Sequence, residues 1–148
     1  MKKLLTALCL LFTATGAIAH TDYIHSQQQF IQHYAQLDNV QRTASGLHYR
    51  IIQQGTGAKP TARSVVSVHY TGRLSNGDIF DSSHARQQAI SFPLNQVIAG
   101  WTEGLQLIQE GGKIELVIPA ALAYGNRSVG DIPANSVLYF EVDLLKVE

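Results

Sequence analysis

Cysteine is almost absent from this chain of 148 residues, and its one copy, Cys9, lies in an amino-terminal segment that we expect to be removed. A chain that keeps no thiol has neither disulfides nor thiol chemistry, even in an oxidising compartment. Its stability must therefore come from a packed core. The roughly 129 residues after position 19 are enough for one such core.

A long hydrophobic run is also missing, which argues against a membrane-spanning helix. The apolar stretch Leu4–Phe12 is too short to cross a bilayer. Lys2 and Lys3 precede it and the small residues of Ala17-Ile18-Ala19 follow it, a pattern that predicts a signal peptide over residues 1–19. The alternative is a membrane anchor. The mature chain would begin at His20 and be exported, to the periplasm or beyond it.

The chain has no excess of charge and no metal-binding pattern. Removing Lys2 and Lys3 from the eleven basic residues leaves nine against eleven acidic ones, so nucleic acid is not an expected partner. The six histidines include no pair at a spacing suited to a helix or strand metal site; His20, His25 and His33, for example, are five and eight residues apart. We therefore expect no metal and no cofactor.

Aromatic residues are few, yet five of them come from five separate segments: Tyr70, Phe80, the single Trp101, Tyr124 and Phe140. Such rings can simply form the core of a small β-rich domain. They can also line a pocket, and two features favour this second interpretation. Asp81 directly follows one ring, and the hydroxyls of Tyr70 and Tyr124 require hydrogen-bond partners.

The amino-terminal part of the chain predicts one short helix and a linker. Ser26 and Gln29 have the spacing of a capping box, and apolar residues then recur at helical spacing, which predicts a helix over about Gln27–Asp38. It could fold back on the main domain or dock on a second subunit. Asn39–Gly46 is polar and reads as a linker. The expected organisation is thus a signal peptide over 1–19, a helical segment with its linker over 20–42, and a main domain over 43–148.

Alternating apolar and polar residues predict strands in the main domain. In the strand over Ser64–Leu74, Val66, Val68 and Tyr70 share one face. Asn76-Gly77 then predicts a hairpin with a type I′ turn. The other expected strands are Leu47–Gln54, Ile79–Ser82, Lys113–Ile118 and Ser136–Val147, the last with Leu138, Phe140, Val142 and Leu144 on one face.

One helix and one long loop complete the domain. Ile98, Trp101, Leu105 and Ile108 recur at three- and four-residue steps, which predicts a helix over Val97–Gln109 that lies against the sheet. Pro119–Pro133 is too long for a tight turn and predicts a functional loop. The expected fold class is α+β: a curved antiparallel β-sheet half-wrapped around one short α-helix.

Four sequence blocks occur in an order that identifies a family. They are Val68-His69-Tyr70-Thr71-Gly72, Phe80-Asp81-Ser82-Ser83, Val97-Ile98-Ala99-Gly100-Trp101 and Ala123-Tyr124-Gly125, and Ile132-Pro133 follows them. Over about residues 43–148 the chain resembles the FKBP-type peptidyl-prolyl cis-trans isomerases, in particular the exported bacterial branch near the macrophage infectivity potentiator. The resemblance implies an FKBP-like fold and catalysis of cis–trans isomerisation at proline in exported proteins.

The resemblance also implies which residues form the site. Trp101 would be the floor of a proline pocket, and the residues that match the family's catalytic positions are Tyr70, Phe80, Asp81, Tyr124 and Phe140. The matching substrate-binding positions are Val97, Ile98, Trp101, Arg86, Ile90 and Ile132. The backbone N–H of Ile98 and the hydroxyl of Tyr124 would each bind a substrate carbonyl. Asp81 would either contact substrate or only hold Tyr70 and Arg86 in place.

The resemblance extends to partners, with some departures. It implies proline-containing unfolded or folding polypeptides as substrates and inhibition by rapamycin or tacrolimus. A wall aromatic of the family is replaced here by Ile90 or Ala89, which opens that wall. Infectivity-potentiator relatives dimerise through a long helical arm, but only about 25 residues precede the domain here, so a monomer is expected. The alternative function is a non-catalytic chaperone module that binds proline peptides in the same pocket, and a third interpretation makes the amino-terminal helix an assembly arm.

Overall fold

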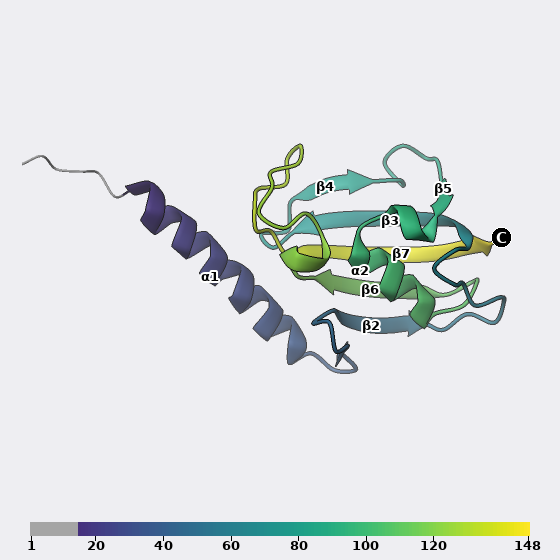
Figure 1. The fold of residues 1–148 in the computed structure, drawn as a ribbon. Coiled ribbons are helices and arrows are strands. Elements are labelled where there is room, and N and C mark those ends of the chain that lie inside the picture. Colours follow the sequence, from purple (N-terminus) through teal and green to yellow (C-terminus); the bar gives the residue numbers. More distant parts are fainter. Residues whose placement is uncertain (1–14) are drawn as a thin grey trace, which may run out of the picture.

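The computed structural model describes residues 15–148, in which an antiparallel sheet of seven strands wraps around a short helix (Figure 1). The strand order is β1-β2-β6-β7-β3-β4, and β5 also pairs with β3, beyond the end of β4. The strands are β1 (Gln41–Arg42), β2 (His48–Gln53), β3 (Val65–Leu74), β4 (Ile79–Ser82), β5 (Ile90–Pro93), β6 (Lys113–Ile118) and β7 (Leu138–Val147). The α+β class predicted from the sequence is confirmed.

The two longest strands, β3 and β7, lie side by side at the centre and confirm the alternation read from the sequence. Val66 and Val68 of β3 are fully buried, and Tyr70 is nearly so. The apolar residues at every second position of β7, from Leu138 to Leu144, are buried on the same face. This face forms the main core.

Helix α2 (Ala99–Gly104) lies on that face and continues into a 3-10 turn over Leu105–Leu107. It is shorter than the predicted helix over Val97–Gln109. Val97 and Ile98 are extended, and the carbonyl of Ile98 accepts the first bonds of the helix, from the N–H groups of Trp101 and Thr102. The helical spacing thus gave the correct buried face but wrong ends.

Helix α1 (Thr15–Ala35) is longer than the helix predicted over Gln27–Asp38. The capping box is therefore wrong: Ser26 lies inside the helix, and its hydroxyl donates to the carbonyl of Tyr23 at 2.6 Å. The predicted signal peptide falls largely outside the described residues. Its last five positions, from Thr15, belong to the first turns of α1. Among residues 15–148, no helix combines the length and apolar composition needed to cross a bilayer.

The carboxyl-terminal half of α1 folds back on the sheet face opposite α2. There Tyr34 packs with Val117 and Val137, and Phe30 and Tyr139 border the cluster. The fold-back alternative is thus the one seen in this structure. Because β6 is covered by α2 on one face and by α1 on the other, five of its six residues are buried.

A buried carboxylate fixes α1 against the sheet. Glu115 of β6, only 7% exposed, accepts hydrogen bonds from Arg50 Nε and Nη2, both at 3.0 Å, and from the Tyr34 hydroxyl at 3.0 Å. Burial, and then the charge of Glu115, raise the pKa of Tyr34, so its phenol remains a neutral donor. Removing either donor would leave a buried charge less well compensated.

Three local predictions need correction. The hairpin at Asn76-Gly77 exists, but only Gly77 has a positive φ, 92°, so the turn is not type I′. The Gly77 N–H bonds to Leu74 O, as in a type I turn followed by a glycine bulge. Strand β5 is missing from the sequence prediction, and β1 lies within the segment interpreted as a linker, because both are short strands defined by pairing to a neighbour.

Gly100 lets α2 approach the sheet closely, and this contact is testable. A Cβ at this position would lie 2.5 Å from Ile118 Cγ2. We expect Gly100→Ala to lower the free energy of unfolding by about 1–3 kcal/mol, because the helix must move away from the core. Urea denaturation measures this change. Ile118→Ala removes the obstructing atoms, so the double variant should lose less than the sum of the single variants; strict additivity would contradict the close contact.

Candidate active site

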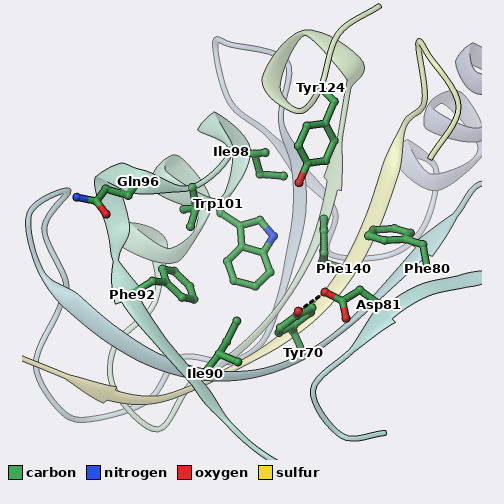
Figure 2. Close-up of a pocket in the computed structure, with 11 residues that line it drawn as sticks. Tyr70, Phe80, Asp81, Ile90, Phe92, Gln96, Ile98, Trp101, Tyr124 and Phe140 are labelled. Carbon is green, nitrogen blue, oxygen red and sulfur yellow. Dashed lines mark hydrogen bonds between the residues drawn. The ribbon is translucent and has the colours of Figure 1, made fainter. Parts of the chain in front are cut away.

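An open pocket of about 540 Å³ lies between α2, the central strands and the loop after β6 (Figure 2). Apolar and aromatic side chains dominate its wall. It is lined by Tyr70, Phe80, Asp81, Ile90, Phe92, Gln96, Val97, Ile98, Trp101, Tyr124 and Phe140. A pocket of this size and character suits a small apolar group with a few polar atoms.

Trp101 forms the floor of the pocket and is held by surrounding rings. Its ring meets those of Tyr70 and Phe140 edge-on, each with centroids 5.1 Å apart, and Phe92 lies 5.5 Å away. Such edge-to-face contacts stabilise a fixed ring orientation beyond simple burial. The indole N–H is buried and has no hydrogen-bond acceptor within residues 15–148.

A second aromatic pair closes the side of the pocket. Phe80 and Phe140 are perpendicular, with centroids 5.5 Å apart. They come this close over β3 because position 72 is glycine: a Cβ there would lie 2.6 Å from Phe80 and 2.7 Å from Phe140. Gly72 of the first sequence block thus has a packing role.

Asp81 is the one charged residue of the lining, and its carboxylate is bound by neighbours. One oxygen accepts a short hydrogen bond from the Tyr70 hydroxyl, and the other pairs with Arg86 Nη1 at 2.5 Å. Arg86 Nη2 also donates to the Tyr70 hydroxyl, at 3.2 Å. The three side chains form a closed triangle that fixes the ring of Tyr70.

The pKa shifts agree with this triangle. Burial alone would raise the pKa of Asp81, but hydrogen bonds from Tyr70 and Arg86 outweigh it and hold that pKa below its usual value. Burial, and next the bond to Asp81, raise the pKa of Tyr70. Asp81 is therefore an anion and Tyr70 a neutral donor at physiological pH.

Besides the buried indole N–H of Trp101, two hydrogen-bond donors at the edge of the pocket are left open. No partner for the backbone N–H of Ile98 or for the hydroxyl of Tyr124 occurs within the described part of the chain. Ile98 precedes α2 in an extended conformation, which keeps its N–H out of the helix. Tyr124 is 38% exposed, and its hydroxyl points into the pocket beside Ile98 (Figure 2). A ligand carbonyl can accept from these two groups.

The structure brings nine of the eleven candidate site residues together in the pocket. Arg86 lies behind the lining, in contact with Asp81 and Tyr70. Ile132 is not among the residues that line the pocket: it is 6% exposed, packs in the main core and pairs with Val129, so its substrate-binding role stays a prediction. The roles assigned to the other residues remain predictions.

Sequence reasoning missed two lining residues, Phe92 and Gln96. Phe92 could have been found, because it lies two positions after Ile90 and therefore shares its face of β5. Gln96 precedes Val97 in a 3-10 turn and carried no sequence signal. Of the two wall positions considered, Ile90 lines the pocket and Ala89 does not.

The lining contains no cysteine, serine, histidine or lysine, so it offers none of the Ser–His or Cys–His pairs used in nucleophilic catalysis. Among residues 15–148, no cluster of three histidine, cysteine or acidic side chains could hold a metal ion. What the pocket can do is to enclose an apolar ring and to bind carbonyl oxygens at its edge.

Two features together define the class of protein: an antiparallel sheet that wraps around a short helix, and a pocket between them with Trp101 at its floor. Residues 56–145 match the model of the family described as FKBP-type peptidyl-prolyl cis-trans isomerase. The chain belongs to this family.

Individual relatives agree with this assignment. The chain is 47% identical over 137 residues to the FKBP-type peptidyl-prolyl cis-trans isomerase FkpA of Aeromonas hydrophila, covering 90% of this chain and 51% of that protein. It is 48% identical over 120 residues to the FKBP-type 22 kDa peptidyl-prolyl cis-trans isomerase of Escherichia coli, covering 80% and 58%. The chain thus spans about half the length of the curated relatives it matches.

Solved structures show the same fold. The crystal structure of FkpA from Escherichia coli matches with a TM-score of 0.86 and 41% identity, over 91% of this chain and 63% of that one. A peptidyl-prolyl cis-trans isomerase from Pseudomonas syringae matches with a TM-score of 0.79 and 37% identity, over 86% and 95%.

The charge triangle makes a prediction about pH. A carboxylate whose pKa is lowered by folding stabilises the fold at pH values above its unfolded-state pKa, which is about 3.9 for aspartate. This contribution is lost as the pH falls through the lower pKa of the folded state. We expect Arg86→Gln to raise the titration midpoint of Asp81, because one hydrogen bond and a positive charge are lost. A ¹³C NMR titration of the carboxyl measures it. Arg63→Gln is the control, and equal midpoints in the two variants would contradict the triangle.

Proposed function

We propose that this protein catalyses cis–trans isomerisation of the peptide bond before proline. The observation that carries the proposal is the combination of an apolar pocket floored by Trp101 with two open donors, Ile98 N–H and Tyr124 O–H, at its edge. Membership of the FKBP-type family supports it. The proline ring would lie on the indole, and the preceding carbonyl would face the donors.

Such a pocket can lower the rotational barrier without a covalent step. The barrier of about 18–20 kcal/mol arises from amide resonance, which places partial charges on oxygen and nitrogen. Water stabilises these charges in the planar amide, and a dry aromatic pocket does so less well. Twisting removes the charge separation, so the pocket favours the twisted state over the planar one. Because free isomerisation takes tens to hundreds of seconds, catalysis would speed folding steps limited by proline.

Each polar group has a distinct part in this scheme. Ile98 N–H and Tyr124 O–H hold substrate carbonyls in a geometry that fits the rotated bond. Asp81 acts through Tyr70, because both of its oxygens already accept hydrogen bonds from Tyr70 and Arg86. We therefore favour a positioning role for Asp81 over direct contact with substrate.

The proposed substrates are proline-containing polypeptides that are unfolded or still folding. The pocket is open to solvent, and Tyr124 at its edge is exposed, so a proline in the middle of a polypeptide segment can reach it. Rapamycin and tacrolimus are proposed ligands of the same pocket. Ile90 in the wall gives them less aromatic surface than the usual family residue would.

A protease-coupled assay on a proline peptide tests the activity. We expect clear acceleration by the wild type and a three- to tenfold lower kcat/KM for Tyr124→Phe, since a hydrogen bond contributes about 0.5–1.5 kcal/mol. Adding Trp101→Leu should reduce the rate further. Tyr49→Phe, which removes a hydroxyl bonded to Gln41 outside the pocket, should leave the rate unchanged.

Two outcomes would contradict the proposal. One is wild-type activity at background, and the other is a rate unaffected by Trp101→Leu combined with Tyr124→Phe. If a Phe80→Ala, Asp81→Ala variant without isomerase activity still suppressed client aggregation, the non-catalytic chaperone module would gain support instead.

We further propose that the protein acts after export, in the periplasm. The support is the charged, apolar and small-residue pattern of residues 1–19. We expect the protein recovered from a periplasmic fraction to begin at His20, as intact mass would show. Substituting Ala17 and Ala19 by bulky residues should retain the precursor, and an uncleaved chain found in the membrane fraction would favour an anchor.

A further inference from the structure

Helix α1 reaches the loop that carries Tyr124, and the residue pairs that bond them are 110 and 113 positions apart in sequence. This loop joins β6 to β7, and α1 passes the end of the sheet from which it leaves (Figure 1). Gln27 Oε1 accepts the Val137 N–H at 3.0 Å, and Tyr23 shares a hydrogen bond of 2.6 Å with Ser136. The base of the loop is therefore tied to the helix.

Gln27 makes the main connection between α1 and the base of this loop. Its side chain is 3% exposed, whereas Gln28, Gln29 and Gln32 of the same helix are exposed. Its amide nitrogen donates to Ser75 Oγ at 2.8 Å, in the turn between β3 and β4. A buried amide must keep its partners, because each unpaired group costs stability. Gln27 thus holds the loop base and the β3–β4 turn at a fixed separation.

A short chain of backbone contacts leads from this base to Tyr124. The N–H of Asn135, two residues before Val137, donates to Gly125 O at 2.8 Å. Gly125 directly follows Tyr124 and is itself bonded to Ala120 O at 2.8 Å. Ser136 Oγ also donates to Pro133 O at 2.6 Å, which stiffens the same arm of the loop. A shift of Val137 would therefore move the backbone next to Tyr124.

We propose that Gln27 is a positioning residue for Tyr124, and that α1 sets the placement of the Tyr124 hydroxyl over the pocket. The inference rests on the proposed isomerase function, in which this hydroxyl binds a substrate carbonyl. The amino-terminal helix then contributes to the site of its own chain without touching the substrate. It does so through the base of the loop and not through the pocket lining.

The test compares two glutamine substitutions in the full chain. Gln27→Leu keeps the volume but removes the hydrogen bonds to Val137 and Ser75, together with one to the neighbouring Ser26. Gln28→Leu makes the same change of side chain on the exposed face. We expect kcat/KM to fall by up to about tenfold only in Gln27→Leu, because small displacements of a binding group reduce the rate strongly. Tyr23→Phe should act in the same direction with a smaller effect, and it provides the test if Gln27→Leu does not fold.

A double-mutant cycle separates positioning from general destabilisation. In a Tyr124→Phe background the hydroxyl is gone, so adding Gln27→Leu should lower kcat/KM no further. A full additional loss would overturn the proposal, because Gln27 would then act elsewhere.

Hydrogen exchange gives a readout that needs no activity. The amides of Ile132 and Asn135 should exchange at least several-fold faster in Gln27→Leu than in Gln28→Leu, while those of β3 and β7 stay protected. Equal exchange in both variants would overturn the proposal. If the wild type had no isomerase activity, the proposed function would fail, and exchange together with an NMR titration of a proline peptide would still decide whether Gln27 positions the loop.

Discussion

The edge-to-face contact of Trp101 with Tyr70 and Phe140 is the constraint on which the rest of this structure depends. It joins α2 to the two central strands, so the rings that give the domain its core also give the pocket its floor. This packing requires glycine at two positions. At Gly72 a Cβ would collide with the rings of Phe80 and Phe140, and at Gly100 it would collide with Ile118 of the sheet. Core stability and pocket shape cannot be separated in such an arrangement, and a substitution that loosens one will distort the other.

Charge has a supporting part on both faces of the sheet. On the pocket side, the two oxygens of Asp81 accept hydrogen bonds from Tyr70 and Arg86. These bonds fix the phenol of Tyr70, and they leave no unpaired charge in the pocket lining. On the opposite side, Glu115 accepts hydrogen bonds from Arg50 and from Tyr34 of α1, and the second bond fixes α1 against the sheet. Each carboxylate organises neighbouring side chains and is satisfied by them. The pocket itself therefore stays apolar, as a mechanism based on desolvation requires.

The sequence predicted most reliably what depends on local pattern. Alternation along β3 and β7 gave the correct buried faces, and the four short blocks contain seven of the nine predicted residues that meet in the pocket. Features decided by distant partners were missed. Strand β5 exists because β3 offers it an edge, and the buried Gln27 of α1 pairs with Val137, 110 positions away in the sequence. Phe92 lay within reach of the periodicity argument, but only once β5 was known to be a strand.

The position of β7 has a consequence for the order in which the molecule can assemble. This strand lies between β6 and β3, with antiparallel partners on both sides, yet it is formed by residues 138–147 and follows the six other described strands in the sequence. A chain that emerges amino terminus first, from a ribosome or a translocation channel, exposes two half-sheets with their apolar faces uncovered until this strand arrives. Phe140 arrives with it, so pocket and core close in a single late event. Before that event, the uncovered apolar faces and the unpaired edges of β6 and β3 are exposed to contacts with other chains.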